Sequence, residues 1–231
     1  MKVFLTTDEG FEVRPWGGRM CFLATEESAG SKLFGVTATL RMGQNLTHER
    51  HVHEELDEII LVLKGNGRQY FIDDKEEKAY DLNPGDLLYI VRNRWHKTDN
   101  ASREEDLELF IINYFTEKQS DMTVPGYVPA GSGKTEEKEY GSARKVITAE
   151  VAGNEEVTAE FITIEPGKSY TAKVAATEEF TYVISGEAEI ISGEEKIKLP
   201  VSSQAYFESG ESYTILNNSA EPVNVFCMRA F

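Results

Sequence analysis

The 231-residue chain carries 40 Asp and Glu against 24 Lys and Arg, which gives a formal net charge of −16. This charge argues against a nucleic-acid partner and against binding to an anionic membrane surface, because both need clustered basic residues. Two Cys residues cannot form a disulfide framework or a Cys-rich zinc site, and a hydrophobic content of 40% excludes a disordered chain.

Short β-rich segments dominate the first half of the chain. They are rich in Val, Ile, Tyr and Phe and are separated by Gly, Pro, Asn and Asp, which is typical of strands joined by turns. No stretch of about 12 residues shows helical periodicity. We expect strands over residues 33–41, 58–63, 68–72, 87–91 and 107–115.

The composition changes over residues 117–141, which contain Pro125-Gly126, Pro129 and a Gly-Ser-Gly run. This segment is predicted to be a linker or a long surface loop. It separates a first predicted domain, residues 1–116, from a second, residues 142–231. In the second domain we expect strands over residues 157–164, 180–184, 189–191, 205–207 and 222–227.

The second half of the chain repeats the pattern of the first. Residues 58–65 read Glu-Ile-Ile-Leu-Val-Leu-Lys-Gly, and residues 179–186 read Glu-Phe-Thr-Tyr-Val-Ile-Ser-Gly. Further along, Asn100-Ala-Ser matches Asn217-Asn-Ser. Two copies of a short-strand pattern predict two small barrels or sandwiches in tandem.

All four histidines of the chain, His48, His51, His53 and His96, lie in the first half. Because side chains alternate along a strand, the imidazoles of His51 and His53 are expected to point the same way. Glu58 follows five residues later, and His96 follows a predicted turn at Pro84-Gly85-Asp86. Three imidazoles and one carboxylate form a ligand set that suits Mn, Fe, Ni, Co or Zn.

These residues carry a family resemblance. Gly43…His51-x-His53-x4-Glu58-x6-Gly65 resembles the first motif of the cupin superfamily, and Gly85-Asp86…His96-x3-Asn100 resembles the second. The resemblance covers both halves and implies an all-β bicupin, with tandem double-stranded β-helix (jelly-roll-like) barrels. It also implies one divalent transition metal per chain, held by the 3-His-1-Glu set His51, His53, Glu58 and His96. Glu54, Glu55 and Asp57 are alternatives to Glu58, which the spacing favours.

The second half lacks the three imidazole ligands. The positions that correspond to His51, His53, Glu58 and His96 hold Ala172, Val174, Glu179 and Tyr213. This set cannot hold a divalent metal in the usual way. We therefore expect a degenerate C-terminal barrel that serves packing, dimerisation or substrate gating.

Other residues are candidates for contacts with a substrate. Arg92 and Arg94 precede His96 and could hold a carboxylate or phosphate, or could simply occupy a solvent-facing turn. Arg68 and Tyr70 could face into the barrel. Glu49 would share the face of His51 and is a candidate general base.

The fourth histidine and a run of four residues near the start of the chain receive other interpretations. His48 is interpreted as a rim residue. The Arg14-Pro15-Trp16-Gly17 run is similar to one in cupins related to sugar-phosphate isomerases, but a Trp packed under a barrel end explains it equally well.

Two classes of function stay open. The first is a metal-dependent enzyme that acts on a small polar metabolite, for which the resemblance permits dioxygenases, decarboxylases, aminohydrolases and isomerases. The second is a non-catalytic metal-binding or small-ligand-binding sensor protein. Retention of one complete ligand set favours the enzyme. We also expect a cytoplasmic homodimer, because no segment resembles a signal peptide or membrane span and exposed barrel edges favour pairing.

Overall fold

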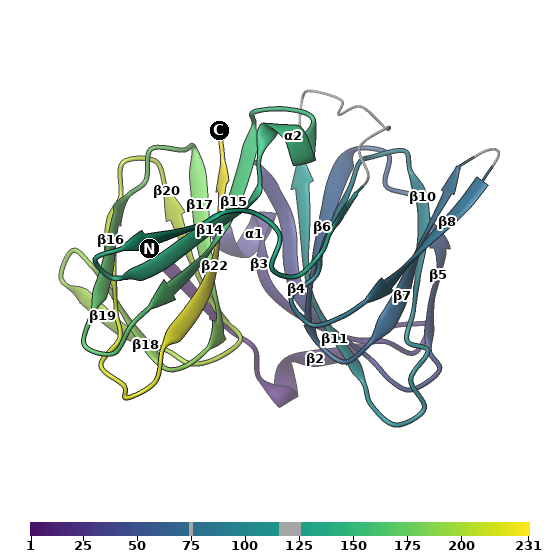
Figure 1. Cartoon of the computed structure of the whole chain (residues 1–231), viewed down its shortest axis with the longest axis horizontal. Coiled ribbons are helices and arrows are strands. Elements are labelled where there is room, and N and C mark those ends of the chain that lie inside the picture. The colour runs from purple at the N-terminus through teal and green to yellow at the C-terminus, as the bar shows by residue number, and fades with distance from the viewer. Residues whose placement is uncertain (74–75, 116–125) are drawn as a thin grey trace. The chain divides into compact units, whose positions relative to one another are not determined.

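The structure, a computed structural model, describes residues 1–73, 76–115 and 126–231. The chain divides into two units of antiparallel strands (Figure 1). The N-terminal barrel comprises Thr6–Ser132, and the C-terminal barrel comprises Met1–Leu5 together with Gly133–Phe231.

The N-terminal barrel is built from two sheets, one of seven strands in the order β12-β9-β6-β11-β4-β3-β2 and one of four in the order β5-β10-β7-β8. Its strands are β2 (Phe11–Val13), β3 (Arg19–Thr25), β4 (Phe34–Met42), β5 (Thr47–His51), β6 (Leu56–Lys64), β7 (Gly67–Asp73), β8 (Glu76–Leu82), β9 (Leu87–Ile90), β10 (Trp95–Asp99), β11 (Leu107–Phe115) and β12 (Tyr127–Val128). Alternate residues of both sheets, such as Ile60, Phe71 and Ile111, form the barrel core. Inward and outward faces thus follow the period of two expected for strands.

The C-terminal barrel repeats this architecture with sheets ordered β1-β20-β17-β22-β15-β14-β13 and β16-β21-β18-β19. Its strands are β1 (Lys2–Leu5), β13 (Thr135–Lys138), β14 (Gly141–Ile147), β15 (Val157–Ile164), β16 (Ser169–Lys173), β17 (Glu178–Ser185), β18 (Ala188–Ser192), β19 (Glu195–Leu199), β20 (Ser203–Glu208), β21 (Ser212–Leu216) and β22 (Val223–Ala230). The core includes Ile162, Val183, Phe207 and Ile215. The prediction of an all-β fold of tandem barrels is confirmed.

Helical structure within the described residues is limited to short segments. These are a 3-10 turn at Asp8–Gly10, α1 (Glu26–Ala29) and α2 (Ala149–Ala152). Thr25 caps α1, and its side chain accepts a hydrogen bond from the Ser28 amide at 3.1 Å. Over the described ranges, the chain has no helix with the length and apolar character needed to cross a bilayer.

The sequence repeat corresponds to a structural repeat at the turn that ends β6 and β17. Gly65 and Gly186 have φ of 78° and 85°. A Cβ on Gly65 would lie 2.3 Å from the Asp106 carbonyl oxygen, and one on Gly186 would lie 2.8 Å from that of Pro222. Both turns therefore require glycine for its conformation and for its lack of a side chain.

The repeated asparagine also has the same role in each barrel. The Asn100 side-chain NH₂ donates to the carbonyl oxygens of Met42 and Glu105, both at 2.9 Å. The Asn217 NH₂ donates to those of Ile164 and Glu221, both at 2.8 Å. Each asparagine thus satisfies buried carbonyls where two loops meet.

The unit boundaries differ from those predicted. The first predicted domain began at residue 1, but β1 pairs with β20 of the C-terminal barrel, with Val3 opposite Ala205. Figure 1 accordingly shows the start of the chain among the strands of that barrel. The predicted loop, 117–141, lies partly outside the described residues, and its remainder contains β12 and β13. A short strand that completes a distant sheet leaves no local signal in the sequence.

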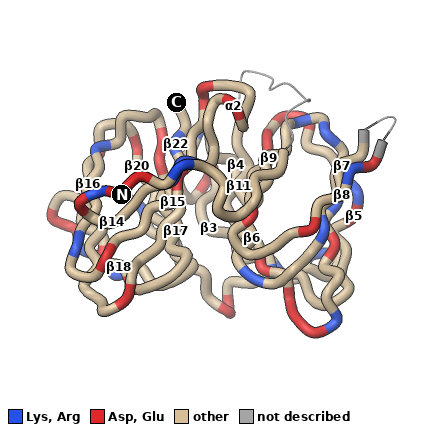
Figure 2. The backbone as a smooth tube through the Cα atoms, in the orientation of Figure 1, with Lys and Arg blue, Asp and Glu red and all other residues tan. Residues whose placement is uncertain are grey.

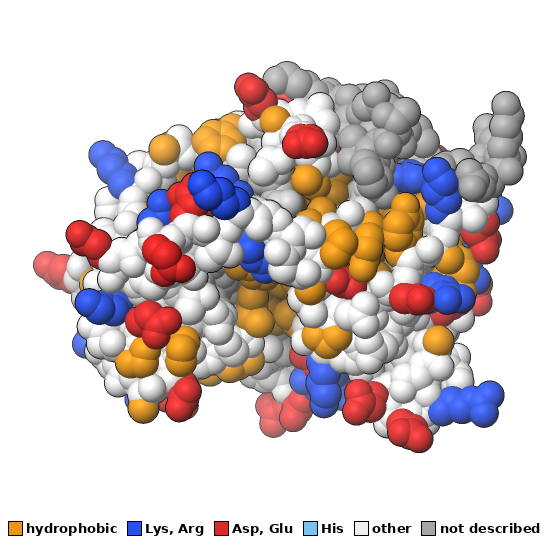
Figure 3. All heavy atoms as spheres, viewed as in Figure 1, with side chains coloured by type: hydrophobic (Ala, Val, Ile, Leu, Met, Phe, Trp, Pro, Cys, Tyr) orange, Lys and Arg blue, Asp and Glu red, His pale blue; other side chains and the backbone are white. Residues whose placement is uncertain are grey.

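Acidic and basic residues are distributed over both units (Figure 2). On the face shown in Figure 3, red and blue side chains are interspersed. Such an interspersed distribution is typical of a solvated surface on a chain with a net charge of −16.

Candidate metal centre

The four predicted metal ligands come together inside the N-terminal barrel. His51 ends β5 and lies directly opposite His96 on β10, while Glu58 lies on β6 of the other sheet. With His53, each residue offers one ligand atom, and these atoms all lie within 4.8 Å of one another. Among the described residues, no other group of three or more potential ligands is found. The two sheets of one barrel therefore build a compact ligand cluster.

Backbone carbonyls orient two of the imidazoles. His51 Nδ1 lies 2.7 Å from the Glu49 carbonyl oxygen, and His96 Nδ1 lies 2.9 Å from that of Arg94. Since a carbonyl can only accept, each Nδ1 carries a proton, and in the neutral form of each ring Nε2 keeps the lone pair that can bind a metal. The Nε2 atoms of His51 and His53 are buried without a hydrogen-bond partner, and that of His96 lies 3.0 Å from Glu58 Oε2. Unpartnered buried nitrogens that converge on a carboxylate fit a metal ion as their common partner.

The charges in the cluster also suit a metal. Glu58 is only 4% exposed, and burial alone would raise the pKa of its carboxyl. The imidazoles of His53 and His96, whose Nε2 atoms lie 3.6 and 3.0 Å from Glu58 Oε2, outweigh burial and hold this pKa well below its ordinary value. Burial lowers the pKa of His51, with a contribution from His96. At neutral pH the site therefore offers a carboxylate and a neutral imidazole, the forms that bind metals.

A β-bulge changes the face presented by the start of β5. His96 pairs with His51 but Thr98 pairs with His48, so Glu49 and Arg50 together lie opposite Lys97. The extra residue reverses the alternation of inward and outward side chains on the part of β5 that precedes it. As a result His48 lies against His51, with ring centroids 4.3 Å apart, while Glu49 is exposed. The prediction that Glu49 shares the face of His51 is wrong, because it assumed a regular strand.

We expect Glu49→Gln to leave the metal content and any catalytic activity within about twofold of wild type, as for most surface substitutions. The reason is that Glu49 contacts His51 through its backbone carbonyl oxygen, which this substitution retains. Metal analysis and steady-state rates of the purified variant check this. A tenfold loss of activity with normal metal content would restore Glu49 as a candidate base.

His48 lies beside the ligand His51 and stacks on Trp16. Their rings stack with centroids 4.2 Å apart and an interplanar angle of 23°. Trp16 also packs against the barrel core. Burial lowers the pKa of His48 to about 4, so its imidazole is neutral at pH 7. The Trp of the Arg14-Pro15-Trp16-Gly17 run therefore packs into the barrel. Its stacking on His48 could not be predicted from the sequence, because the two residues lie far apart along the chain.

The two arginines that precede His96 lie in different environments. Arg94 is 4% exposed, and its guanidinium carbon lies 4.3 Å from the centre of the Phe71 ring. Arg92 is partly buried, and its backbone NH donates to Asp57 Oδ1 at 2.8 Å. The role of either side chain as an anion fork stays a prediction.

Arg68 and Tyr70 face away from the metal ligands. On β7 the inward residues are Gln69 and Phe71, which are both fully buried. Arg68 is exposed, and its Nε donates to Asp81 Oδ1 at 2.8 Å. The Tyr70 ring lies 4.1 Å from the Lys97 ammonium. The prediction that these two side chains face inward is wrong by one residue of strand register.

The C-terminal barrel reproduces the cluster without its imidazoles. Ala172 lies opposite Tyr213, as His51 lies opposite His96. The Tyr213 hydroxyl donates to Glu179, and Val174 is buried in the core. The predicted correspondence of the two sites is therefore confirmed by strand register.

A guanidinium provides the counter-charge for Glu179. Arg229 lies directly opposite Glu179 on the neighbouring strand, and its Nε donates to Glu179 Oε2 at 2.9 Å. Its other nitrogens donate to Glu160 at 2.6 Å and to the Tyr170 hydroxyl oxygen at 3.0 Å. Sequence reasoning missed Arg229, although an Arg within the apolar end of β22 is an unusual residue for a buried strand.

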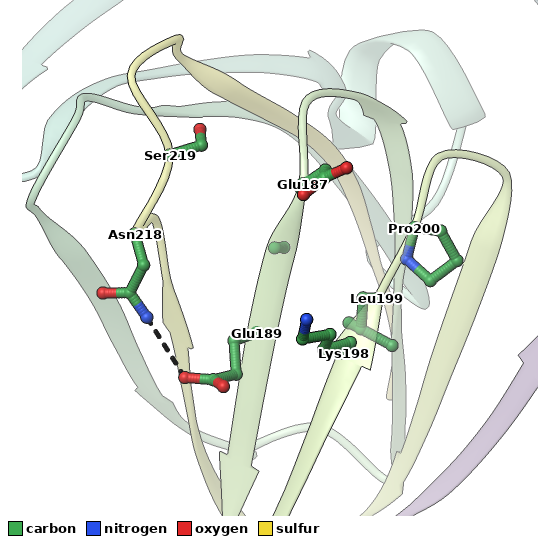
Figure 4. Close-up of a pocket in the computed structure, with 8 residues that line it drawn as sticks. Glu187, Glu189, Lys198, Leu199, Pro200, Asn218 and Ser219 are labelled. Atoms are coloured by element: carbon green, nitrogen blue, oxygen red, sulfur yellow. Dashed lines mark hydrogen bonds between the residues drawn. The ribbon is translucent and has the colours of Figure 1, made fainter.

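The C-terminal barrel also has a cavity of about 470 Å³ between β18, β19 and the loop after β21 (Figure 4). It is lined by Glu187, Ala188, Glu189, Lys198, Leu199, Pro200, Asn218 and Ser219. The Asn218 NH₂ donates to Glu189 at 3.1 Å, the dashed line in Figure 4. This lining has no imidazole or thiol, so it lacks the donors of the N-terminal cluster.

The repeated barrels and their motifs match a known protein family. The Cupin domain model matches residues 38–113 and, a second time, residues 160–229. The chain belongs to the cupin family. Each match lies within one barrel of this cupin, and the first contains all four clustered residues. A comparison with curated proteins found no match.

Solved structures with the same fold include two bacterial oxalate decarboxylases. A single-residue variant of the Bacillus subtilis enzyme aligns with a TM-score of 0.82 and 15% identity over 99% of this cupin and 76% of that chain. A formate complex of the Lactobacillus farciminis enzyme aligns with a TM-score of 0.83 and 14% identity, over 99% and 85% of the two chains. A structure described for the Mn(II) centres of the B. subtilis enzyme aligns with a TM-score of 0.80 and 15% identity, over 98% of this cupin and 77% of that chain. At this identity the likeness establishes the fold.

Proposed function

We propose that the N-terminal barrel binds one divalent transition-metal ion through His51, His53, Glu58 and His96, and that it decarboxylates a small carboxylate there. The observation that carries the proposal is the cluster itself. Two of its imidazoles have their protons directed to backbone carbonyls, and two buried Nε2 atoms have no hydrogen-bond partner. These features leave three nitrogens and one carboxylate available to a metal.

The charge of the site favours an anionic substrate. A bound divalent ion would supply a Lewis acid with open coordination positions. Glu58 neutralises one of its two charges, and neutral imidazoles neutralise none, so the site would keep a positive charge. Phe71 lies directly opposite His96 and Ile90 directly opposite Glu58, and both side chains belong to the apolar core of the barrel. A positive charge in apolar surroundings attracts a small anion more strongly than it would in water.

The structural neighbours support the decarboxylase class. They are structures of oxalate decarboxylases, one of them a formate complex and another described for its Mn(II) centres. With the oxalate monoanion as substrate, such a reaction breaks the C–C bond and releases one carbon as CO₂. The electron pair of that bond stays on the other carbon, which takes up the proton of the monoanion and becomes formate. The substrate would have to fit within one barrel, which limits it to a small molecule.

The test is a product assay on metal-loaded protein. Wild type reloaded separately with Mn(II), Fe(II), Co(II), Ni(II) and Zn(II) is incubated with oxalate, other dicarboxylates, keto acids and sugar phosphates, and CO₂, organic products and oxygen uptake are measured. We expect CO₂ release from a small carboxylate in wild type and none in Glu58→Gln. Metal-loaded protein that binds these compounds but turns over none of them would instead support a non-catalytic ligand-binding cupin.

A further inference from the structure

Asn113 is an inward-facing polar residue beside the metal ligands. It lies on β11 directly opposite Glu58 on β6. Leu107, Leu109 and Ile111 of the same strand point into the core, so alternation places Asn113 on the inner face as well. Directly opposite residues on antiparallel strands have Cβ atoms about 5 Å apart. The amide therefore lies next to the carboxylate ligand.

The amide of Asn113 is not committed to the protein. Within the part of the chain that the structure describes, its Oδ1 is buried and has no hydrogen-bond partner. A buried polar atom without a partner costs about 1–3 kcal/mol, so such atoms call for an explanation. The residue as a whole is only partly buried. Because rotation of the terminal amide exchanges its two ends, the NH₂ group can also occupy this place.

The C-terminal barrel shows what a side chain at this position can reach. Arg229 holds the equivalent place, since it lies opposite Glu179 as Asn113 lies opposite Glu58. Its guanidinium contacts Glu179 at 2.9 Å and the Tyr170 hydroxyl at 3.0 Å. A donor at this register thus points to the centre of the barrel. Asn113 is shorter than Arg229 and carries no charge, so it cannot replace the metal as a counter-charge. Its NH₂ group can still donate a hydrogen bond.

We propose that Asn113 binds the substrate by donating a hydrogen bond from its NH₂ group to an oxygen of a carboxylate held at the metal site. This inference rests on the proposed function and assigns a specificity residue to it. The surrounding core side chains are apolar, so a hydrogen bond to an anionic oxygen there would be strong. The substrate class is a small carboxylate that can contact the metal and the Asn113 amide at the same time.

The experiment titrates cobalt-loaded protein with oxalate and follows the visible absorption of Co(II). We expect Asn113→Ala to keep about one cobalt per chain and to bind oxalate at least about tenfold more weakly than wild type. Asn113→Asp should also keep the metal, because it adds negative charge, but should lose oxalate binding through repulsion. A purely structural role would not retain metal while abolishing anion binding.

Asn218→Ala is the matched control, since it makes the same chemical change in the C-terminal cavity. We expect it to leave the oxalate titration unchanged. The inference is overturned if Asn113→Ala binds oxalate within twofold of wild type, if it loses cobalt, if oxalate binding depends on Asn218, or if cobalt-loaded wild type does not respond to oxalate. Failure of wild type to bind any of the metals would contradict the proposed function itself, which the cobalt content reports separately.

Discussion

Adding a divalent metal ion should raise the unfolding temperature of the N-terminal barrel by about 10 °C or more and leave the C-terminal barrel unchanged. Only the folded barrel presents His51, His53, Glu58 and His96 together. Free metal at about 1,000 times its Kd stabilises the folded state by roughly 4 kcal/mol, and each kcal/mol shifts a domain of this size by several degrees. Calorimetry with Mn(II) or Co(II) measures the shift, and amide hydrogen exchange assigns it to a barrel.

Glu58→Gln is the control for this prediction, because it keeps the size of the side chain and removes its charge. The shift should disappear in this variant. A shift of equal size in Glu58→Gln, or one confined to the C-terminal barrel, would show that the metal binds elsewhere.

Removal of the Arg229 guanidinium should destabilise the C-terminal barrel by about 3–5 kcal/mol, the usual cost of breaking a buried ion pair. Glu179 is 1% exposed, and Arg229→Met leaves its carboxylate buried without its cationic partner. The same substitution removes hydrogen bonds to Glu160 and Tyr170. Urea denaturation gives the free energy of unfolding, and amide hydrogen exchange of β17 and β22 assigns the loss to the C-terminal barrel.

Two further variants separate the ion pair from other effects of the substitution. Adding Glu179→Gln to Arg229→Met should recover part of the loss, because the buried charge is then removed. Arg68→Met, which breaks an exposed ion pair with Asp81, should leave the denaturation midpoint nearly unchanged. A loss of less than about 1 kcal/mol in Arg229→Met would mean that the guanidinium is not the counter-charge of Glu179.

The sequence was sufficient for the fold class and for the ligand cluster. Both follow from spacing: His51 and His53 are two residues apart, and the Glu58–Gly65 segment recurs at Glu179–Gly186. The same repeat identified Ala172 and Tyr213 as the counterparts of two ligands, which strand register confirms. Short-range periodicity and internal repeats are preserved because each strand must keep its buried face.

The remaining features depend on long-range register. The bulge at Glu49 and Arg50 reverses the face of a strand by one extra residue, and β1 joins a sheet made almost entirely from the other end of the chain. The contacts of Asn113 and Arg229 depend on which residue of a distant strand lies opposite. Neither periodicity nor composition contains this information. The cytoplasmic location and the homodimer stay predictions.

The most direct test of the account is the metal-to-protein ratio. Wild type, His96→Ala and Tyr213→Phe are stripped with a chelator, reloaded with Mn(II) or Co(II), dialysed and analysed for metal by mass spectrometry. The account predicts one ion per chain in wild type and in Tyr213→Phe. It predicts almost none in His96→Ala, because loss of a direct ligand costs more than the roughly 10–100-fold in affinity caused by loss of an outer-shell partner. Two ions per chain, none in wild type, or a full ion in His96→Ala would contradict it.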